Sequence, residues 1–547
     1  MSYQYDGTLP MNVNWTGSVN GNIKVRYNND MKVLAETINN KDSVNFVYDK
    51  DGLLTNAGAL KLKSSTANNL LLSDTLGTVV TNYTYTSFGE IASQQSLFGS
   101  TVLYQVNYTR DSLGRISEKT ETIQGVATKY DYVYDVKGQL MQVSKNDTII
   151  STYTYDANGN RLTHITPTQA DSGVYDEQDR LIHYSSSQYL YSTNGDLQKK
   201  IQGSDTTRYD YDAMGNLLSV ILPNGSRIEY VADGAGRRII RKTDGQITNR
   251  WLYSDELRIS GEVDSVGNVV SHFVYATKQN MPDYIAKGGI TYRVLTDQLG
   301  SVRQVINSVT GEVVQRMDYD EFGNVINSIG LQIVPMGFAG GIYDQQTGLT
   351  RFGARDYDAK IGRWTIKDPL LFGSGLTNHY LYTSNNPINL IDYNGGVSES
   401  AGNSGPFGVP DVKINMGQAV AAATIFAAAT NLINTVVAIG MEGEISAKEI
   451  ASLGLDMFAI SAATYNYAAF SQSEFANASE TDPIGYLAKE LGFSKQGVAL
   501  GAAITAGVTV ALTAKAFPSI SVLAKTMNVT MAVYAFGKAT WIPAWMP

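Results

Sequence analysis

The chain has 547 residues, enough for two or more domains, and its 51 Gly and 34 Tyr residues favour tight turns and strands. It has no Cys, which excludes disulfides and thiolate metal sites, and its net charge of −9 gives no overall basic footprint for nucleic acid. The sequence does not begin with a basic stretch followed by an apolar one, which is the pattern of a secretory signal peptide. We therefore expect a specialised export route if the protein is secreted or displayed on the cell surface.

A short unit recurs through the first half of the chain, loosely every 20 residues or so. It reads aromatic-x-Tyr-Asp, then two or three residues, then Gly, a polar residue and Leu or Ile, as in YTYDANGNRLTHI at 153–165. The tyrosines that mark its copies fall mostly 19–26 residues apart: Tyr108, Tyr134, Tyr155, Tyr175, Tyr211, Tyr230, Tyr253 and Tyr275. This spacing predicts a repeat array.

Each unit predicts a β-hairpin. Alternation places the rings of Tyr153 and Tyr155 on one face of a strand, and the following residues alternate again as the return strand. Between the strands, Asp156 can cap local N–H groups, and Gly159 can adopt a positive φ. One hairpin is marginally stable alone, so neighbouring units must pair. We interpret the repeat aspartates as turn caps, and no spacing typical of a metal or cofactor site accompanies them.

Residues 296–396 carry denser motifs than the array before them. In chain order they read DQLGSVR, YDEFGNV, GGIYDQQTGLTRFGARDYDAKIGRW, KDP and NLIDYNGG. With the Tyr-Asp units before it, this block resembles the bacterial Rhs/YD-repeat proteins and their Rhs repeat-associated core domain. The resemblance implies that residues 1–295 wind into a hollow β-shell and that residues 296–396 form a core domain closing one end.

The resemblance also implies a chemistry. In this family the core domain can be an intramolecular aspartic protease that cuts just after a DPxGL motif. When the family motifs are matched to this sequence, the motif arginine corresponds to Arg355 and the two catalytic aspartates correspond to Asp368 and Asp392. Two close carboxylates cannot both ionise, so one keeps a proton while the other activates water.

The terminal motif departs from the family pattern. It reads DYNGG at 392–396, so Tyr393 stands in place of Pro and Gly396 in place of Leu. The expected cleavage is therefore between Gly396 and Val397, without the leucine that would anchor the segment. The alternative is that Arg355 and Asp368 form a purely structural ion pair.

The last third of the chain has a different composition. A Ser- and Gly-rich linker at 397–412 leads into an Ala-rich segment, 413–547, for which we predict α-helices. Two stretches, of 28 and 19 residues at 414–441 and 496–514, carry no charge and approach the length that spans a bilayer. We interpret 413–547 as a membrane-inserting effector. A buried helical cargo without lytic activity and an enzyme with an unrecognised site are the alternatives.

These observations predict a mainly β protein with an α-helical hydrophobic C-terminal segment. The resemblance implies a polymorphic toxin, whose shell carries an effector released by autoproteolysis, with a cognate immunity protein, delivery machinery and a target membrane as partners. We expect no nucleic-acid partner. The alternative function is a non-enzymatic cell-surface adhesion or carbohydrate-binding protein that uses exposed rows of tyrosine.

Overall fold

A computed structural model describes residues 1–371 and 376–400 of the chain. The predicted helical segment, 413–547, lies outside the described residues, as does most of the predicted linker. The described residues all belong to one compact unit. Within the described residues, no helix has the length and apolar character needed to cross a membrane.

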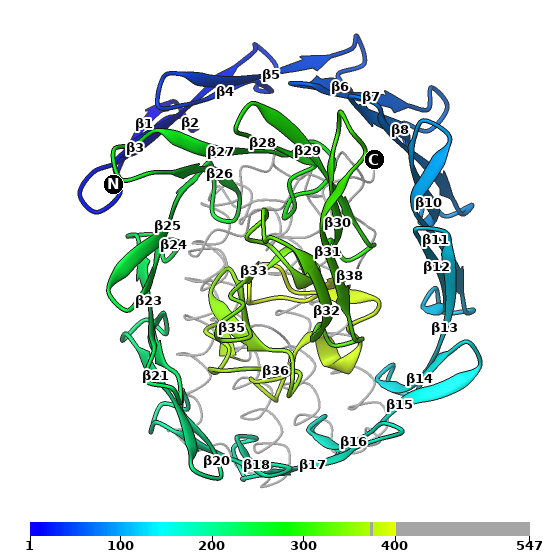
Figure 1. Cartoon of the computed structure of the whole chain (residues 1–547), viewed down its shortest axis with the longest axis vertical. Helices are drawn as coiled ribbons and strands as arrows, with labels where there is room; N and C mark the ends of the chain where they lie inside the picture. The colour runs from blue at the N-terminus through cyan, green and yellow to red at the C-terminus, as the bar shows by residue number, and fades with distance from the viewer. Residues whose placement is uncertain (372–375, 401–547) are drawn as a thin grey trace, which may run out of the picture. The chain divides into compact units, whose positions relative to one another are not determined.

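The dominant element is one meandering sheet of 32 strands (Figure 1). Its first part comprises β1 (Ser2–Asp6), β2 (Leu9–Trp15), β3 (Gly21–Tyr27), β4 (Val33–Ile38), β5 (Asp42–Tyr48), β6 (Leu54–Ala57), β7 (Leu60–Ser64), β8 (Leu71–Leu76), β9 (Val79–Tyr85), β10 (Ile91–Phe98), β11 (Thr101–Arg110), β12 (Ile116–Ile123) and β13 (Val126–Tyr134). It continues through β14 (Leu140–Lys145), β15 (Thr148–Tyr155), β16 (Arg161–Ile165), β17 (Ala170–Tyr175), β18 (Leu181–Tyr184), β19 (Ser187–Tyr191), β20 (Leu197–Gln202), β21 (Asp205–Tyr211), β22 (Leu217–Ile221), β23 (Arg227–Ala232) and β24 (Arg238–Thr243). It ends with β25 (Gln246–Tyr253), β26 (Ile259–Val263), β27 (Val269–Val274), β28 (Tyr284–Lys287), β29 (Ile290–Thr296), β30 (Val302–Asn307), β31 (Val313–Tyr319) and β32 (Val325–Gly330).

Each strand pairs antiparallel with the next strand in the chain, as the hairpin prediction requires. In the unit at 153–165, the Tyr153 and Tyr155 rings stack with centroids 6.5 Å apart. The turn forms as expected: the Asp156 carboxylate accepts the N–H groups of residues 158 and 160, and Gly159 adopts a φ of +81°. The repeat aspartate of this unit, Asp156, is therefore a turn cap.

The repeat tyrosines also join one hairpin to the preceding one. The Tyr155 hydroxyl donates a hydrogen bond of 2.8 Å to the Leu140 carbonyl, 15 residues upstream. The same bond recurs from Tyr27, Tyr48, Tyr85, Tyr134, Tyr175, Tyr253 and Tyr275 to carbonyls 14–18 residues before them. Since the rings lie buried or half-buried, these tyrosines do not form the exposed rows that a carbohydrate-binding surface would need.

The sheet curves until its later strands lie against its first strands. β25 meets β3, and the strands that follow pack against the first strands of the chain (Figure 1). Buried ion pairs cross between the two layers, Arg293 to Asp74 at 2.8 Å and Arg303 to Glu121 at 2.8 Å. A shared apolar cluster includes Trp15 of the first layer and Ile285 of the second. The sheet is thus a spiral whose late strands lie inside its early ones.

A small β-rich segment follows the sheet and lies within its curve (Figure 1). It contains η1 (Phe338–Gly340), β33 (Ile342–Tyr343), β34 (Leu349–Phe352), β35 (Arg355–Asp358), β36 (Arg363–Trp364), η3 (Thr383–Asn385), β37 (Leu390–Ile391) and β38 (Glu399–Ser400). An aromatic cluster fills it, in which the rings of Tyr357 and Tyr382 lie 4.3 Å apart. We call residues 331–400 the core.

Hydrogen bonds attach the core to the inner face of the sheet at many strands. Arg363 donates to Asn160 at 2.7 Å, and the Tyr380 hydroxyl donates to the Gly195 carbonyl at 2.8 Å. Farther along the chain, the Arg238 guanidinium pairs with Asp356 at 2.8 Å. The sheet and the core are therefore one folded body, and the sheet runs past the expected boundary at residue 296 to end at Gly330.

Candidate functional site

The three residues expected to act together, Arg355, Asp368 and Asp392, lie together in the core. Arg355 opens β35, Asp368 follows β36, and Asp392 follows β37. One guanidinium nitrogen, Nη2 of Arg355, lies 3.0 Å from Asp368 Oδ2 and 3.2 Å from Asp392 Oδ2. The two carboxylates therefore share a single cationic atom.

The cluster is almost fully buried. Arg355, Asp368 and Asp392 are each 3% exposed or less. Burial raises the pKa of Asp392 above its ordinary value; the Arg355 charge opposes that shift, and the nearby Asp368 charge adds to it. Two carboxylates beside one cation leave an excess negative charge, a setting in which one of them readily takes up a proton.

Other contacts fix the arginine rigidly. Its Nε donates to the Gly395 carbonyl at 2.7 Å and its Nη1 to the His379 carbonyl at 3.2 Å. The guanidinium also lies over the Trp364 ring, 4.1 Å from its centroid. The motif could identify Arg355, but nothing in the sequence pointed to these carbonyls or to the tryptophan, because they come from other turns and strands.

The predicted cleavage segment is held in the same place. Gly396 is buried, and its N–H donates to Asp392 Oδ1 at 2.9 Å, while Val397 is 42% exposed. The chain then returns as β38 and pairs with β37. The tip of this small hairpin, residues 392–398, therefore contains both the aspartate and the peptide bond expected to be cut.

The turn between β34 and β35 brings the cleavage segment to Arg355. The Ala354 N–H donates to the Asn394 carbonyl at 3.0 Å. Gly353 has a φ of +41°, and a Cβ there would lie 2.2 Å from the same carbonyl oxygen. Glycine is thus required here both by its backbone angle and by the close approach of the segment.

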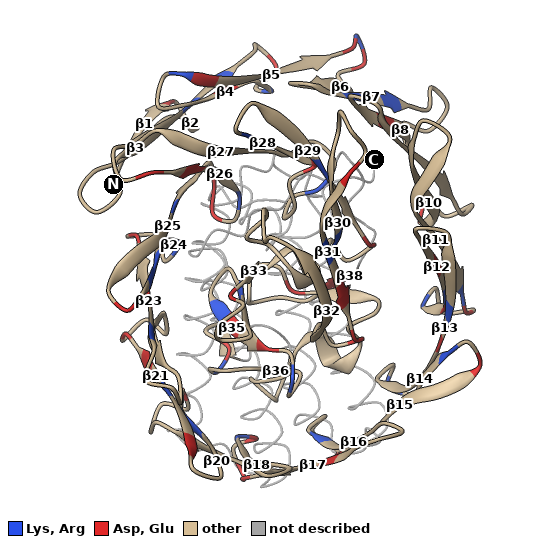
Figure 2. Ribbon diagram, in the orientation of Figure 1, with Lys and Arg blue, Asp and Glu red and all other residues tan. Residues whose placement is uncertain are grey.

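Elsewhere in the described residues, acidic and basic residues are interspersed along the strands of the sheet (Figure 2). No group of three or more His, Asp or Glu side chains with metal-binding geometry occurs among residues 1–371 and 376–400.

A meander of Tyr-Asp hairpins wound around an attached core defines a YD-repeat shell. The family model described as the teneurin YD-shell matches residues 1–393, and the chain belongs to this family.

Curated relatives align with much of this chain, but the aligned part is a small share of each relative's own length. Teneurin-3 of Mus musculus is 29% identical over 340 residues, which is 58% of this chain and 12% of that protein. The tRNA3(Ser)-specific nuclease WapA of Bacillus spizizenii is 27% identical over 274 residues, 48% of this chain and 12% of that protein. The chain thus spans only about an eighth of these relatives.

Solved structures share the fold. The crystal structure of TcdB2-TccC3 superposes with a TM-score of 0.58 at 19% identity, covering 69% of this chain and 22% of that one. The Photorhabdus luminescens Tc holotoxin pore gives 0.59 at 19% identity, covering 69% and 21%. The family resemblance read from the Tyr-Asp motifs is confirmed, and the structures that share the fold include a Tc holotoxin.

Proposed function

We propose that the chain is the shell and core of an Rhs-type polymorphic toxin, and that its core is an intramolecular aspartic protease. The observation that carries this proposal is the buried cluster of Arg355 with Asp368 and Asp392, set against the peptide segment that the family motif marks for cleavage. A buried arginine beside two carboxylates also occurs in the sheet, at Arg293 with Asp74 and Asp283, so it is the position beside the expected cleavage segment that supports the proposal.

The proposed reaction is hydrolysis of the Gly396–Val397 peptide bond. Asp368 accepts a proton from a water molecule as the water oxygen attacks the Gly396 carbonyl carbon. Asp392, whose pKa burial raises, gives its proton to the Val397 nitrogen as the C–N bond breaks. The products are a carboxyl group on Gly396 and an amine on Val397. Arg355 keeps both aspartates in position.

The remaining parts of the proposal rest on sequence and kinship. Segment 413–547 is proposed to be the released effector, and its long uncharged stretches favour action on a membrane. Relatives whose names describe a toxin or a nuclease support delivery by a dedicated machine, with a cognate immunity protein protecting the producing cell. Expression of residues 397–547 inside bacterial cells is expected to arrest growth.

The test of autoproteolysis is the intact mass of the purified full-length protein. We expect two fragments divided at Gly396–Val397 in the parent and one full-length species in Asp368→Asn. The matched control is Asp344→Asn, which alters a buried aspartate of the core that pairs with Arg241 and not with Arg355, and should leave cleavage intact. A single full-length species in the parent would refute the protease.

A further inference from the structure

The side chain of Asn394 lies against the peptide bond that is expected to be cut. Its Oδ1 atom accepts hydrogen bonds from the N–H groups of Gly396, at 2.9 Å, and Val397, at 3.2 Å. The second of these nitrogens belongs to the Gly396–Val397 bond itself. One oxygen atom therefore contacts the residues on both sides of that bond, including the nitrogen that leaves when the bond is hydrolysed.

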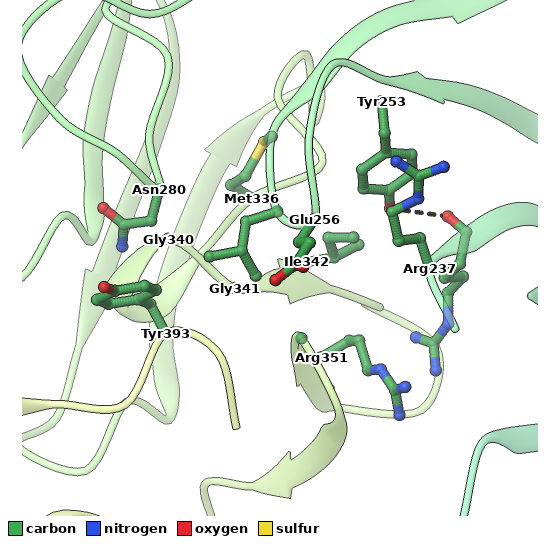
Figure 3. Close-up of a pocket in the computed structure, with 13 residues that line it drawn as sticks. Arg237, Tyr253, Glu256, Asn280, Met336, Gly340, Gly341, Ile342, Arg351 and Tyr393 are labelled. Carbon is green, nitrogen blue, oxygen red and sulfur yellow. Dashed lines mark hydrogen bonds between the residues drawn. The ribbon is translucent and has the colours of Figure 1, made fainter. Parts of the chain in front are cut away.

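The main chain on either side of Asn394 is fixed by the rest of the fold. Arg355 donates to the carbonyl of Gly395, the next residue, at 2.7 Å. Tyr393, the residue before, packs against the aromatic cluster of the core and lines a cavity of about 40 Å³ whose wall also includes Asn280 of the sheet (Figure 3). The Asn394 side chain thus starts from a backbone that is held on both sides.

The turn itself does not depend on the Asn394 side chain. The N–H of Gly396 already donates to Asp392 Oδ1 at 2.9 Å, which is the bond that closes this turn. What Asn394 adds is the contact with the Val397 nitrogen, beyond the end of the turn. A role in holding the Gly396–Val397 bond explains this contact, whereas a role in the turn does not.

A second side chain, Leu370, fills the space beside Gly396. A Cβ at position 396 would lie 3.1 Å from Leu370 Cδ1, a tight contact, and 3.5 Å from Asn394 Oδ1. The Leu370 N–H donates to Asp368 Oδ1 at 2.8 Å, so this leucine is tied to the Arg355 cluster. Gly396 does not have a positive φ, and it is therefore this packing rather than the backbone angle that favours glycine here.

We propose that Asn394 positions the Gly396–Val397 bond for cleavage and stabilises its leaving nitrogen, and that Leu370 closes the space beside Gly396. This inference rests on the proposed protease and assigns two further residues to its site. As the C–N bond breaks, the Val397 nitrogen takes a proton and gains positive charge. A hydrogen bond from a charged N–H is stronger than one from a neutral amide, so Asn394 Oδ1 stabilises the transition state more than the uncut peptide.

The test is the first-order rate of self-cleavage, followed by pulse–chase during cell-free translation of the full-length chain. Asn394→Ala should slow cleavage by about tenfold to a hundredfold, the usual cost of misplacing a reacting bond. Asn394→Asp keeps an oxygen acceptor and should restore most of the rate. Its pH optimum should move upward, because the added charge disfavours ionisation of Asp392.

The matched control is Asn224→Ala. Asn224 is also exposed, also precedes a glycine, and accepts the N–H of Ser226 at 3.0 Å in a turn of the sheet. Its loss should leave the rate of cleavage unchanged. A rate for Asn394→Ala within about twofold of the parent would overturn the proposal.

The role of Leu370 is tested by moving its side chain. Leu370→Ala leaves a gap beside Gly396, and Gly396→Leu places a second leucine where Leu370 already lies, so each change should slow cleavage. The double variant again has one leucine in that space and should cleave faster than either single variant. Losses that simply add in the double variant would contradict the assignment of Leu370.

A second measurement separates this inference from the protease on which it rests. Hydrogen exchange of the Val397 amide is measured by mass spectrometry in Asp368→Asn, which stays uncut. Adding Asn394→Ala should raise that exchange rate at least tenfold, and adding Asn224→Ala should not. Unchanged exchange beside a parent that cleaves overturns this inference and leaves the protease standing. A parent that stays uncut refutes the protease and, with it, the action of Asn394 on the leaving nitrogen.

Discussion

Removal of the Arg355 guanidinium tests the electrostatics of the core directly. Arg355→Met retains a side chain of similar length that can still cover Trp364, but it removes the cation that Asp368 and Asp392 share. Removing one partner of a buried ion pair typically costs about 3–5 kcal/mol, because the remaining charge stays buried. We expect a loss of stability of that size at pH 7.

The loss should depend on pH in a definite direction. The pKa of Asp392 is higher in the folded chain than in the unfolded chain. The folded state therefore binds this proton more tightly, which stabilises the fold at pH values below the unfolded-state pKa of Asp392. That stabilisation is lost as the pH rises through the folded-state pKa of Asp392. Without Arg355, the attraction that opposes the raised pKa is gone. The variant should therefore recover part of its lost stability at mildly acidic pH, where Asp392 carries its proton.

The assay is urea unfolding of the full-length protein at pH 7 and in mildly acidic buffer, followed by tryptophan fluorescence, since Trp364 lies under the arginine. The triple variant Arg355→Met, Asp368→Asn, Asp392→Asn should regain most of the loss, because it removes the uncompensated charges. Arg227→Met is the exposed control and should be close to neutral. A loss below about 1 kcal/mol, or one equal at both pH values, would refute this account of the cluster.

Two further predictions concern the repeats and their junction with the core. Gly159→Ala should cost more than Gly89→Ala in urea unfolding. Both glycines have a φ near +80°, which costs alanine about 1–2 kcal/mol, but only at Gly159 does a Cβ meet the core, 3.2 Å from Leu381. Equal losses would show that the turn does not support the core. Burial and the neighbouring Glu321 raise the pKa of Asp320 to about 7, so its protonated form stabilises the fold at lower pH and that contribution is lost as the pH rises through 7. Asp320→Asn keeps the acceptor for the turn and should flatten the fall in Tm between pH 6 and 8, and an unchanged slope would contradict the assignment.

Local parts of this fold could be predicted from the sequence because they depend on neighbouring residues. The alternation at Tyr153 and Tyr155 and the cap at Asp156 need only one hairpin, and both have the expected geometry. The winding of the sheet could not be predicted, because it depends on pairs such as Asp74 with Arg293, 219 residues apart. No local pattern distinguishes these two residues from ordinary solvent-facing charges.

The candidate site shows the same limit. The family motif identified Arg355, Asp368 and Asp392, and the structure places them together. The pairing of Asp356 with both Arg238 and Arg351 had no sequence signal, because it arises only when β24 and β34 meet.

The terminal motif is itself built like a repeat turn. In the repeat at Asp156, the Oδ1 atom accepts the N–H four residues on, from Asn160, and the glycine between them has a positive φ. Asp392 does the same: its Oδ1 accepts the N–H of Gly396, and Gly395 has a φ of +72°. The DYNGG segment is therefore a turn of the kind that the array uses throughout.

What differs is the second carboxylate oxygen and its surroundings. In the repeat turn, the Asn160 side-chain amide donates a hydrogen bond to Oδ2 of Asp156, which is only partly buried. In the terminal turn, Oδ2 of Asp392 faces Arg355 in a site 2% exposed, and its pKa rises. A carboxylate that caps a partly exposed turn in the repeat thus has a raised pKa when a turn of the same kind is buried near a second aspartate, without any new local motif.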